Sequence, residues 1–309
     1  MKNLCLVALL LCATAGFAMP IASSARAMVP SEIQQLIGVD YRALKDSPTA
    51  MALKQQVMPD NLKELETALK GIGIDTNQDV DQLDFASFRT PKKGIQTIGV
   101  AAGSFSAKAV LKKMKLKKIS AVKYGTASIY PMNNGLVMTF LDDNTLAFGT
   151  EASLHSALDT RDGKRPSLDS NPEMADQMAE VDGEPLWSIL DQKGTQAMMF
   201  SVMGDAAKVA DYDTLKSRIL ASRYTMNFQT GVNFDLSVVT ADSMTAATLS
   251  TIVKGVMLYK KMNASPIEKT AIDATTVDSD SANLVVHFKS DDQKFQSLMH
   301  APLFAAVSH

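Results

Sequence analysis

The sequence predicts an α+β fold, with two similar modules of antiparallel sheet and helices packed on one face of each. Short turns rich in Gly, Asn and Asp join apolar alternating segments between residues 119 and 149, a pattern typical of hairpins. Helical patterns follow these paired strands instead of alternating with single strands. Antiparallel pairing with helices between the hairpins favours α+β over a parallel sheet.

The first module is expected at residues 28–159. Ser47 and Pro48 provide a capping hydroxyl and a proline at the first helical position, and helical spacing runs on to Gly71 with a break at Pro59. Thr150 is placed to cap a helix that reaches Leu158. The remaining predicted elements are strands at 39–44, 82–88, 95–102, 119–124, 127–132, 136–141 and 145–149, and a helix at 106–115.

The second module is expected at residues 171–309, after a polar linker at 160–170. Asn171 and Pro172 begin a helix that extends to Ala179. Both modules show much the same order of elements, which suggests an internal duplication; the alternative is two unrelated stretches with common element lengths. The other predicted elements are strands at 185–191, 221–229, 232–241, 272–277 and 284–289, and helices at 194–210, 243–261 and 291–299, the last capped by Asp291.

Residues 1–27 have the three parts of an export signal. Lys2 is the positive residue, Leu4 to Ala18 is nearly continuous apolar sequence, and Ala25-Arg26-Ala27 fits the small-x-small pattern for cleavage. A membrane anchor is the alternative, but Pro20 and the polar residues after it shorten the run below the roughly 20 apolar residues that a spanning helix needs. We therefore expect an exported protein, periplasmic or extracellular, that begins at Met28 and has no later transmembrane segment.

Cleavage would remove both cysteines. Cys5 and Cys12 lie in the signal, and Leu11 before Cys12 is not the small residue that lipidation requires. The mature chain would then have no disulfide and no cysteine metal site. Loss of Lys2 and Arg26 from the 31 basic residues leaves 29, against 33 acidic residues, so a nucleic-acid partner is not expected.

Acidic residues and histidines suggest metal or catalytic sites only weakly. The alternating oxygen ligands of Asp75–Asp81 suit a hard cation, but Val80 and Ala86 stand where an EF-hand loop needs Gly and Glu. A solvated turn is the simpler interpretation. The four histidines do not have the spacing of a metal pair on a helix: His155, His287, His300 and His309.

No known nucleotide or hydrolase motif is present. The chain lacks the glycine patterns of phosphate loops and dinucleotide sites, and it has no G-x-S-x-G nucleophile turn. The sequence therefore predicts no catalytic residue, no cofactor and no metal.

Two further patterns could mark surfaces. Lysines at 112, 113, 115, 117, 118 and 123 form a basic run. The run could bind an anionic lipid, a cell-wall polymer or a nucleic acid, and the simpler interpretation is a solvated helix end. Methionines cluster at 198, 199 and 203 and again at 244, 257 and 262, which suggests either a pliable apolar groove or helix faces packed on sheets. The helix at 243–261 is apolar widely enough to predict near-complete burial, and Trp187 is expected in the core.

Three phrases resemble a pattern in uncharacterised secreted bacterial proteins built of tandem α+β modules. These are VDYRALKDSP, GIDTNQDVDQLDFASF and LAFGTEASLHSALD, and together they span about half of the mature chain. The resemblance implies export and α+β modules, and it implies no catalytic residues.

We therefore expect an exported, soluble, non-enzymatic protein that binds a hydrophobic ligand or another protein in the cell envelope. The alternative is a hydrolase whose site the spacing of residues does not reveal. A third possibility is an interaction module that pairs through an exposed strand near residues 145–149.

Overall fold

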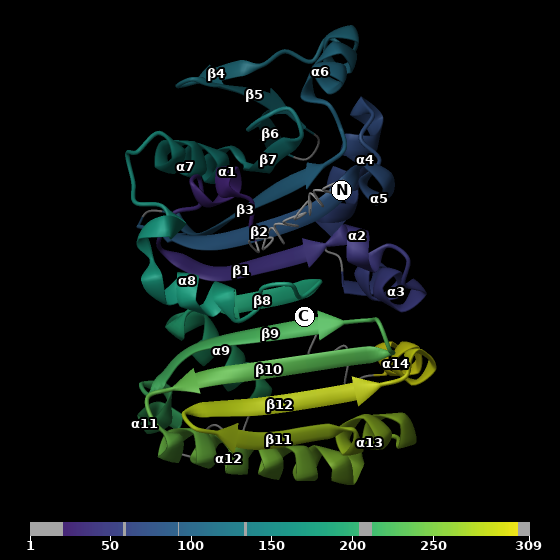
Figure 1. Cartoon of the computed structure of the whole chain (residues 1–309), viewed down its shortest axis with the longest axis vertical. Helices are drawn as coiled ribbons and strands as arrows, with labels where there is room; N and C mark the ends of the chain where they lie inside the picture. The colour runs from purple at the N-terminus through teal and green to yellow at the C-terminus, as the bar shows by residue number, and fades with distance from the viewer. Residues whose placement is uncertain (1–20, 58–59, 92, 133–134, 204–211, 302–309) are drawn as a thin grey trace, which may run out of the picture.

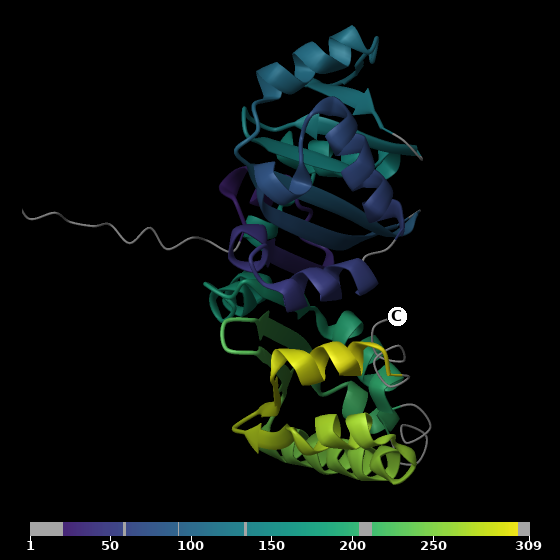
Figure 2. The ribbon, with the colours of Figure 1, turned by 90° about the vertical axis from the view of Figure 1, so that its right-hand side faces the viewer.

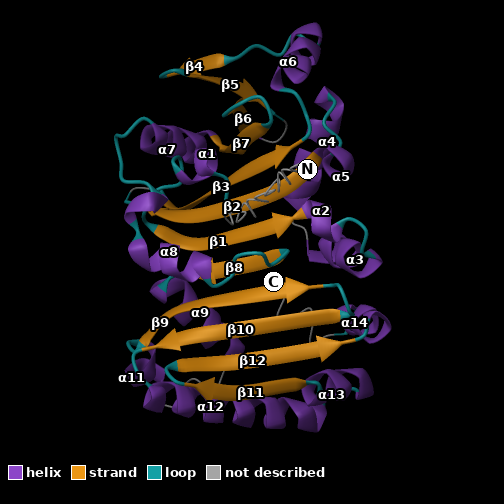
Figure 3. Ribbon diagram, viewed as in Figure 1, coloured by secondary structure: helices purple, strands orange, loops and turns teal. Residues whose placement is uncertain are grey.

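The computed structural model describes residues 21–57, 60–91, 93–132, 135–203 and 212–301. It confirms the α+β class: a single 12-stranded sheet runs the length of the molecule with helices packed against it (Figures 1 and 3). Every strand pairing recorded within this sheet is antiparallel. The sheet order is β11-β12-β10-β9-β8-β1-β2-β3-β7-β6-β5-β4.

The first half of the chain supplies one end of this sheet. Its helices and strands are α1 (Ser23–Arg26), β1 (Ile33–Asp40), α2 (Tyr41–Leu44), α3 (Pro48–Val57), α4 (Asp60–Ile72), α5 (Thr76–Asp79), β2 (Val80–Thr90), β3 (Gly94–Gly103), α6 (Ala107–Leu116), β4 (Val122–Tyr124), β5 (Ala127–Pro131), β6 (Leu136–Phe140), β7 (Thr145–Thr150) and α7 (Glu151–Arg161).

The second half supplies the other end, after a 3-10 turn at Leu168–Ser170. Its elements are α8 (Pro172–Ala179), β8 (Leu186–Leu190), α9 (Gln192–Met203), α11 (Tyr212–Lys216), β9 (Ile219–Asn227), β10 (Val232–Thr240), α12 (Ser243–Asn263), α13 (Pro266–Asp273), β11 (Thr275–Asp280), β12 (Asn283–Ser290) and α14 (Asp292–Met299).

The two halves arrange their strands in the same order. From the junction outward, the first half reads β1-β2-β3-β7-β6 and the second reads β8-β9-β10-β12-β11, with β4 and β5 as additional strands of the first half. The junction itself is an antiparallel pairing of β1 with β8. A duplicated module whose copies share one sheet would have this arrangement.

Helices cover both faces of the first half's sheet, although the sequence suggests one. Ala86 and Phe88 of β2 belong to a core cluster with α1, α7 and α8, whereas Leu83 and Phe85 pack on a second cluster with α4 and α6. β7 is buried at five of its six positions. A strand that is covered by helices on both faces carries apolar side chains at consecutive positions. The apolar–polar alternation of a half-exposed strand is then absent, so the sequence pattern does not show that helices cover the second face.

In the second half, α9, α12, α13 and α14 lie on one face of the sheet, as Figure 2 shows for α12, α13 and α14, whereas α8 packs on the opposite face against Trp187 and Ile189. Val238 of β10 packs with α9 and α12, and Val232 at the other end of the same strand packs with α14. Leu53 of α3 joins this last cluster, so a helix of the first half helps to cover the sheet of the second.

Several predicted elements are displaced. The strand predicted at 39–44 is instead β1 at Ile33–Asp40 followed by the helix α2, because Asp40 caps a helix by accepting from the Ala43 amide. The strand predicted at 272–277 begins only at Thr275, after the helix α13, which the sequence analysis does not predict. The predicted break at Pro59 lies outside the described residues.

Candidate functional site

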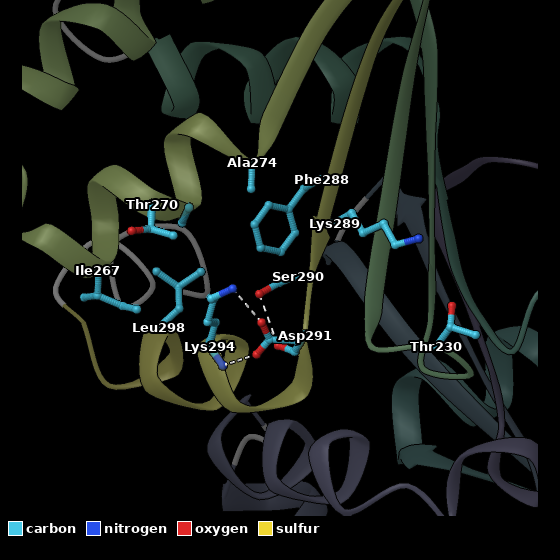
Figure 4. Close-up of a pocket in the computed structure, with 11 residues that line it drawn as sticks. Thr230, Ile267, Thr270, Ala274, Phe288, Lys289, Ser290, Asp291, Lys294 and Leu298 are labelled. Atoms are coloured by element: carbon cyan, nitrogen blue, oxygen red, sulfur yellow. Dashed lines mark hydrogen bonds and ion pairs between the residues drawn. The ribbon is translucent and has the colours of Figure 1, made fainter.

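A pocket lies between α13, α14 and the end of β12 (Figure 4). Its volume is about 270 Å³. Apolar side chains form much of its wall, and three hydroxyl groups, two lysines and one aspartate complete the lining. These residues are Thr230, Ile267, Thr270, Ala271, Ala274, Phe288, Lys289, Ser290, Asp291, Lys294 and Leu298.

The start of α13 fixes one wall of the pocket. Ser265 and Glu268 form a capping box, in which the Ser265 amide donates to Glu268 Oε2 at 2.8 Å and the Glu268 amide donates to Ser265 Oγ at 3.5 Å. Pro266 occupies the first helical position. From this start, α13 directs Ile267, Thr270, Ala271 and Ala274 to the pocket, at the spacing that places side chains on one helical face.

The start of α14 fixes the opposite wall. The Asp291 carboxylate accepts from the Lys294 amide at 2.8 Å, as the sequence predicts for a helix cap, and it also pairs with Lys294 Nζ at 2.8 Å. The rings of Phe288 and Phe295 lie 6.3 Å apart and hold α14 against β12. Leu298, one turn beyond Lys294, faces the apolar wall of α13.

The charged side chains at the pocket form one ion pair, Lys294 with Asp291. The Lys294 side chain and amide, by bonding to Asp291, hold the pKa of that carboxyl below its usual range. Lys294 is the lysine whose side chain lies at the pocket, whereas the side chain of Lys289 points away from it on the other face of β12 (Figure 4). An apolar wall with Lys294 at its edge and several hydroxyl donors suits a small molecule that has an apolar part and an anionic group.

The histidines are not brought together. His155 lies on α7 and His287 on β12, and seven steps of the sheet order separate β12 from β7, roughly 34 Å at the usual spacing between strands. His155 stacks on Tyr124 with ring centroids 3.8 Å apart, whereas His287 contacts Asp235 on the open face of the sheet. Neither bonds to a serine in the described structure. His300 is the C-cap of α14, and His309 lies outside the described residues.

The acidic segment Asp75–Asp81 contains the short helix α5 and the first two residues of β2. Asp75 caps the helix by accepting from the Asn77 amide, and the Asp75 amide donates to Asp79 Oδ2 at 2.7 Å. Asp81 pairs with Arg42 at 2.9 Å. Within the described ranges, no three His, Cys, Asp or Glu side chains gather as a metal site would require.

The lysine run lies at the exposed C-terminal end of α6. Lys112, Lys113 and Lys115 are exposed on the helix, and Lys118 beyond it has a positive φ of 59°. Lys123 of β4 donates to Ser128 Oγ at 2.9 Å. Cations at this end of a helix lie near its unpaired carbonyl groups.

The methionines divide between core and surface. Met199 and Met203 are buried under the sheet, whereas Met244 and Met262 of α12 are 78% and 76% exposed. Leu258 and Tyr259 of α12 are 67% and 70% exposed, so the predicted near-complete burial of this helix is wrong. The sheet covers only the side of α12 that carries Leu249 and Val253. Because apolar residues occur on all sides of this helix, its sequence does not show which side stays exposed.

We call Met244, Leu258, Tyr259 and Met262 the α12 stripe. Figure 1 places α12 along the outer end of the molecule, beyond the edge strand β11. The helix contains no Asp or Glu, and it carries Lys254, Lys260 and Lys261. Within the described structure, no helix has both the length and the apolar content needed to cross a bilayer.

Comparison with known proteins identifies the fold. No protein-family model matches the chain, and no curated protein matches it in sequence. A crystal structure of TP0453, in crystal form III, is similar with a TM-score of 0.50 and 6% identity, over 89% of this chain and 97% of that chain. Crystal form I of TP0453 has a TM-score of 0.49 and 8% identity, over 91% and 98%. At such low identity, the likeness concerns the fold alone.

Proposed function

We propose that this protein is an exported binding protein for a small amphiphilic molecule, held in the pocket between α13, α14 and β12. The observation that carries the proposal is the combination of an apolar wall with Lys294 at the edge. Burial of apolar surface would supply most of the affinity, and Lys294 would orient an anionic group.

The size of the pocket limits the ligand. Pockets for drug-sized molecules usually span about 300–1,000 Å³, and this one measures about 270 Å³. It therefore suits a compact molecule, or one end of a longer apolar chain.

A fluorescent probe tests this proposal. Anilinonaphthalene sulfonate combines apolar rings with an anionic group, and its emission rises when it leaves water. We expect saturable binding to the wild type. Ala271→Trp, which fills the pocket from α13, should weaken binding about tenfold or more, and Lys294→Gln should weaken it several-fold with less dependence on salt.

The matched control is Ala175→Trp, which introduces the same side chain on an exposed position of α8. It should bind the probe as the wild type does. Equal affinity in the wild type and in Ala271→Trp would contradict binding in this pocket.

A second candidate function, association with an anionic lipid surface, is favoured by the α12 stripe. A helix with large exposed apolar side chains, lysines and no acids has the composition of helices that lie in the membrane interface. Its position at the end of the molecule would let it lie flat on a bilayer.

Vesicle sedimentation tests this candidate. Binding to vesicles with anionic lipid should exceed binding to zwitterionic vesicles and should fall with salt. Leu258→Glu with Met262→Glu should abolish it, whereas Ile95→Glu, a similar change at a half-exposed position of β3, should not. Equal sedimentation with anionic and zwitterionic vesicles, unchanged by the double substitution, would contradict a role for α12.

A further inference from the structure

Residues Ile21–Val29 form part of the core, although the sequence places most of them in the export signal. Ile21 is 1% exposed, Ala25 and Met28 are fully buried, and Val29 is 2% exposed. All four belong to the cluster that also contains Leu154 of α7 and sheet residues of β1, β2 and β3. Figure 1 shows α1 beside α7 and in front of β3.

Polar contacts tie this segment to the connection between the two halves. Arg26 Nη2 pairs with Asp169 Oδ1 at 2.5 Å, and the Leu168 amide donates to the Val29 carbonyl at 2.8 Å. The Ser31 amide donates to the Pro166 carbonyl at 3.0 Å. The segment therefore holds residues 166–169 in place as well as filling the core.

Cleavage after Ala27 would damage this arrangement in two ways. It would remove Ile21 and Ala25 from the core and Arg26 from its ion pair. It would also create a charged ammonium group on Met28, whose side chain and surroundings are buried. Placing a charge at such a position is costly unless a partner neutralises it.

The sequence offers a second cleavage pattern upstream. Gly16-Phe17-Ala18 also has small residues at the first and third positions. The apolar run Leu4–Leu11 before it has a length typical of an export signal. A chain that begins at Met19 keeps the whole of α1 and places its new ammonium group two residues before the buried Ile21.

We infer that export processing hydrolyses the bond between Ala18 and Met19, and that α1 remains as a structural element of the mature protein. One water molecule is consumed, and the products are a carboxylate on Ala18 and an ammonium group on Met19. The enzyme class required is a signal peptidase that accepts small residues before the scissile bond. The inference rests on the export that the sequence predicts and is independent of the proposed ligand.

N-terminal sequencing of the protein recovered from the periplasm or medium of an exporting bacterium tests the inference. A mature chain that begins at Met19 supports it, and one that begins at Met28 or Met1 overturns it. Ala18→Leu should cause the precursor to accumulate, whereas the matched Ala27→Leu should still mature at Met19. Blocked processing in Ala27→Leu alone would overturn the inference.

A stability measurement tests the structural basis separately. Chains produced without the signal, one beginning at Met19 and one at Met28, are compared by thermal unfolding. The chain that begins at Met28 should melt at least about 5 °C lower, because it loses buried apolar side chains and the ion pair to Asp169. Equal melting temperatures would show that α1 does not contribute to the stability of the fold, and would overturn the structural argument for cleavage at Met19.

Discussion

The indole ring of Trp187 lies directly over Gly38, at the junction between the two halves of the sheet. The two residues are cross-strand partners in the pairing of β8 with β1. A β-carbon on Gly38 would stand 2.3 Å from the Trp187 ring atoms Cε2 and Cζ2. Trp187 is 3% exposed, so the predicted core position is confirmed, and glycine is the residue that leaves room for it.

Gly38→Ala should destabilise the protein by on the order of 2–3 kcal/mol, because the added methyl group overlaps the buried Trp187 ring and forces the ring or the strand to shift. Urea unfolding followed by circular dichroism would measure the loss. Trp187→Leu in the Gly38→Ala background should recover part of it, since the smaller side chain removes the overlap. Independent, additive effects of the two substitutions would contradict this account.

Gly255→Ala is the matched control for this substitution. Gly255 lies inside α12, and the space that a β-carbon would occupy there is open, with no neighbouring side chain within 4 Å. The methyl group should fit, and replacing glycine inside a helix should stabilise the protein by about 0.5–1 kcal/mol. A loss of stability at this position would show that the effect at Gly38 is not specific to the Trp187 contact.

The two halves should unfold in one cooperative transition. They share the β1–β8 pairing, and Leu53 of α3 packs in the same cluster as Phe295 and Leu298 of α14. Trp187 is the only tryptophan and lies at the junction. Its fluorescence and the far-ultraviolet circular dichroism should therefore give coincident urea transitions, and two separated transitions would contradict the prediction.

Local signals in the sequence predict the helix starts and the hairpins well. Thr150 and Asn171 cap α7 and α8 as expected, by accepting from backbone amides three residues ahead. Gly125 has the positive φ of 55° that its turn requires. Capping and tight turns depend on three or four adjacent residues, so the sequence alone carries the necessary information.

Relationships between distant segments are not predictable in this way. The sequence around Gly38 and Trp187 does not indicate that β1 and β8 pair. The alternation of apolar residues shows which side chains of a strand face the core, but it does not show which other strand lies beside it. The pocket depends on α13, which is not among the predicted elements, although Ser265, Pro266 and Glu268 form a recognisable capping box. The exposed side of α12 also depends on what the rest of the fold leaves uncovered.

An ion pair should strengthen the contact between the two halves. Arg89 of β2 makes two bonds to Asp191, at 2.5 and 3.0 Å, and Asp191 also accepts from the Gly194 amide at the start of α9. Asp191→Asn keeps the helix cap and removes the charge. We expect a loss of roughly 0.5–1.5 kcal/mol of unfolding free energy, smaller at high salt, because both side chains are partly exposed.

The exposed pair of Lys254 with Asp278, at 3.2 Å, provides the comparison. Lys254→Gln should change the stability by less than about 0.5 kcal/mol. Urea unfolding at low and high salt would measure both variants. A larger effect at Lys254 than at Asp191 would contradict the role given to the Arg89 pair.

Asp84 should make the protein less stable as the pH rises through neutrality. Burial in the sheet raises the pKa of this carboxyl to about 8, and the hydrogen bond from Gln82 offsets only part of the shift. Between about pH 4 and pH 8, the folded state keeps a proton that the unfolded state has lost, so the unfolding free energy falls with increasing pH. Above about pH 8, the carboxyl is ionised in both states and the decline from this group ends.

Asp84→Asn removes this contribution, because the amide is neutral in both states and can still bond to Gln82. The variant should therefore gain stability relative to the wild type as the pH rises from 5 to 8, by up to about 1.4 kcal/mol per pH unit, and the difference should level off near pH 9. Urea unfolding of both proteins at pH 5, 7 and 9 would measure it. A difference that stays constant across this range would show that the Asp84 carboxyl is already ionised in the folded protein.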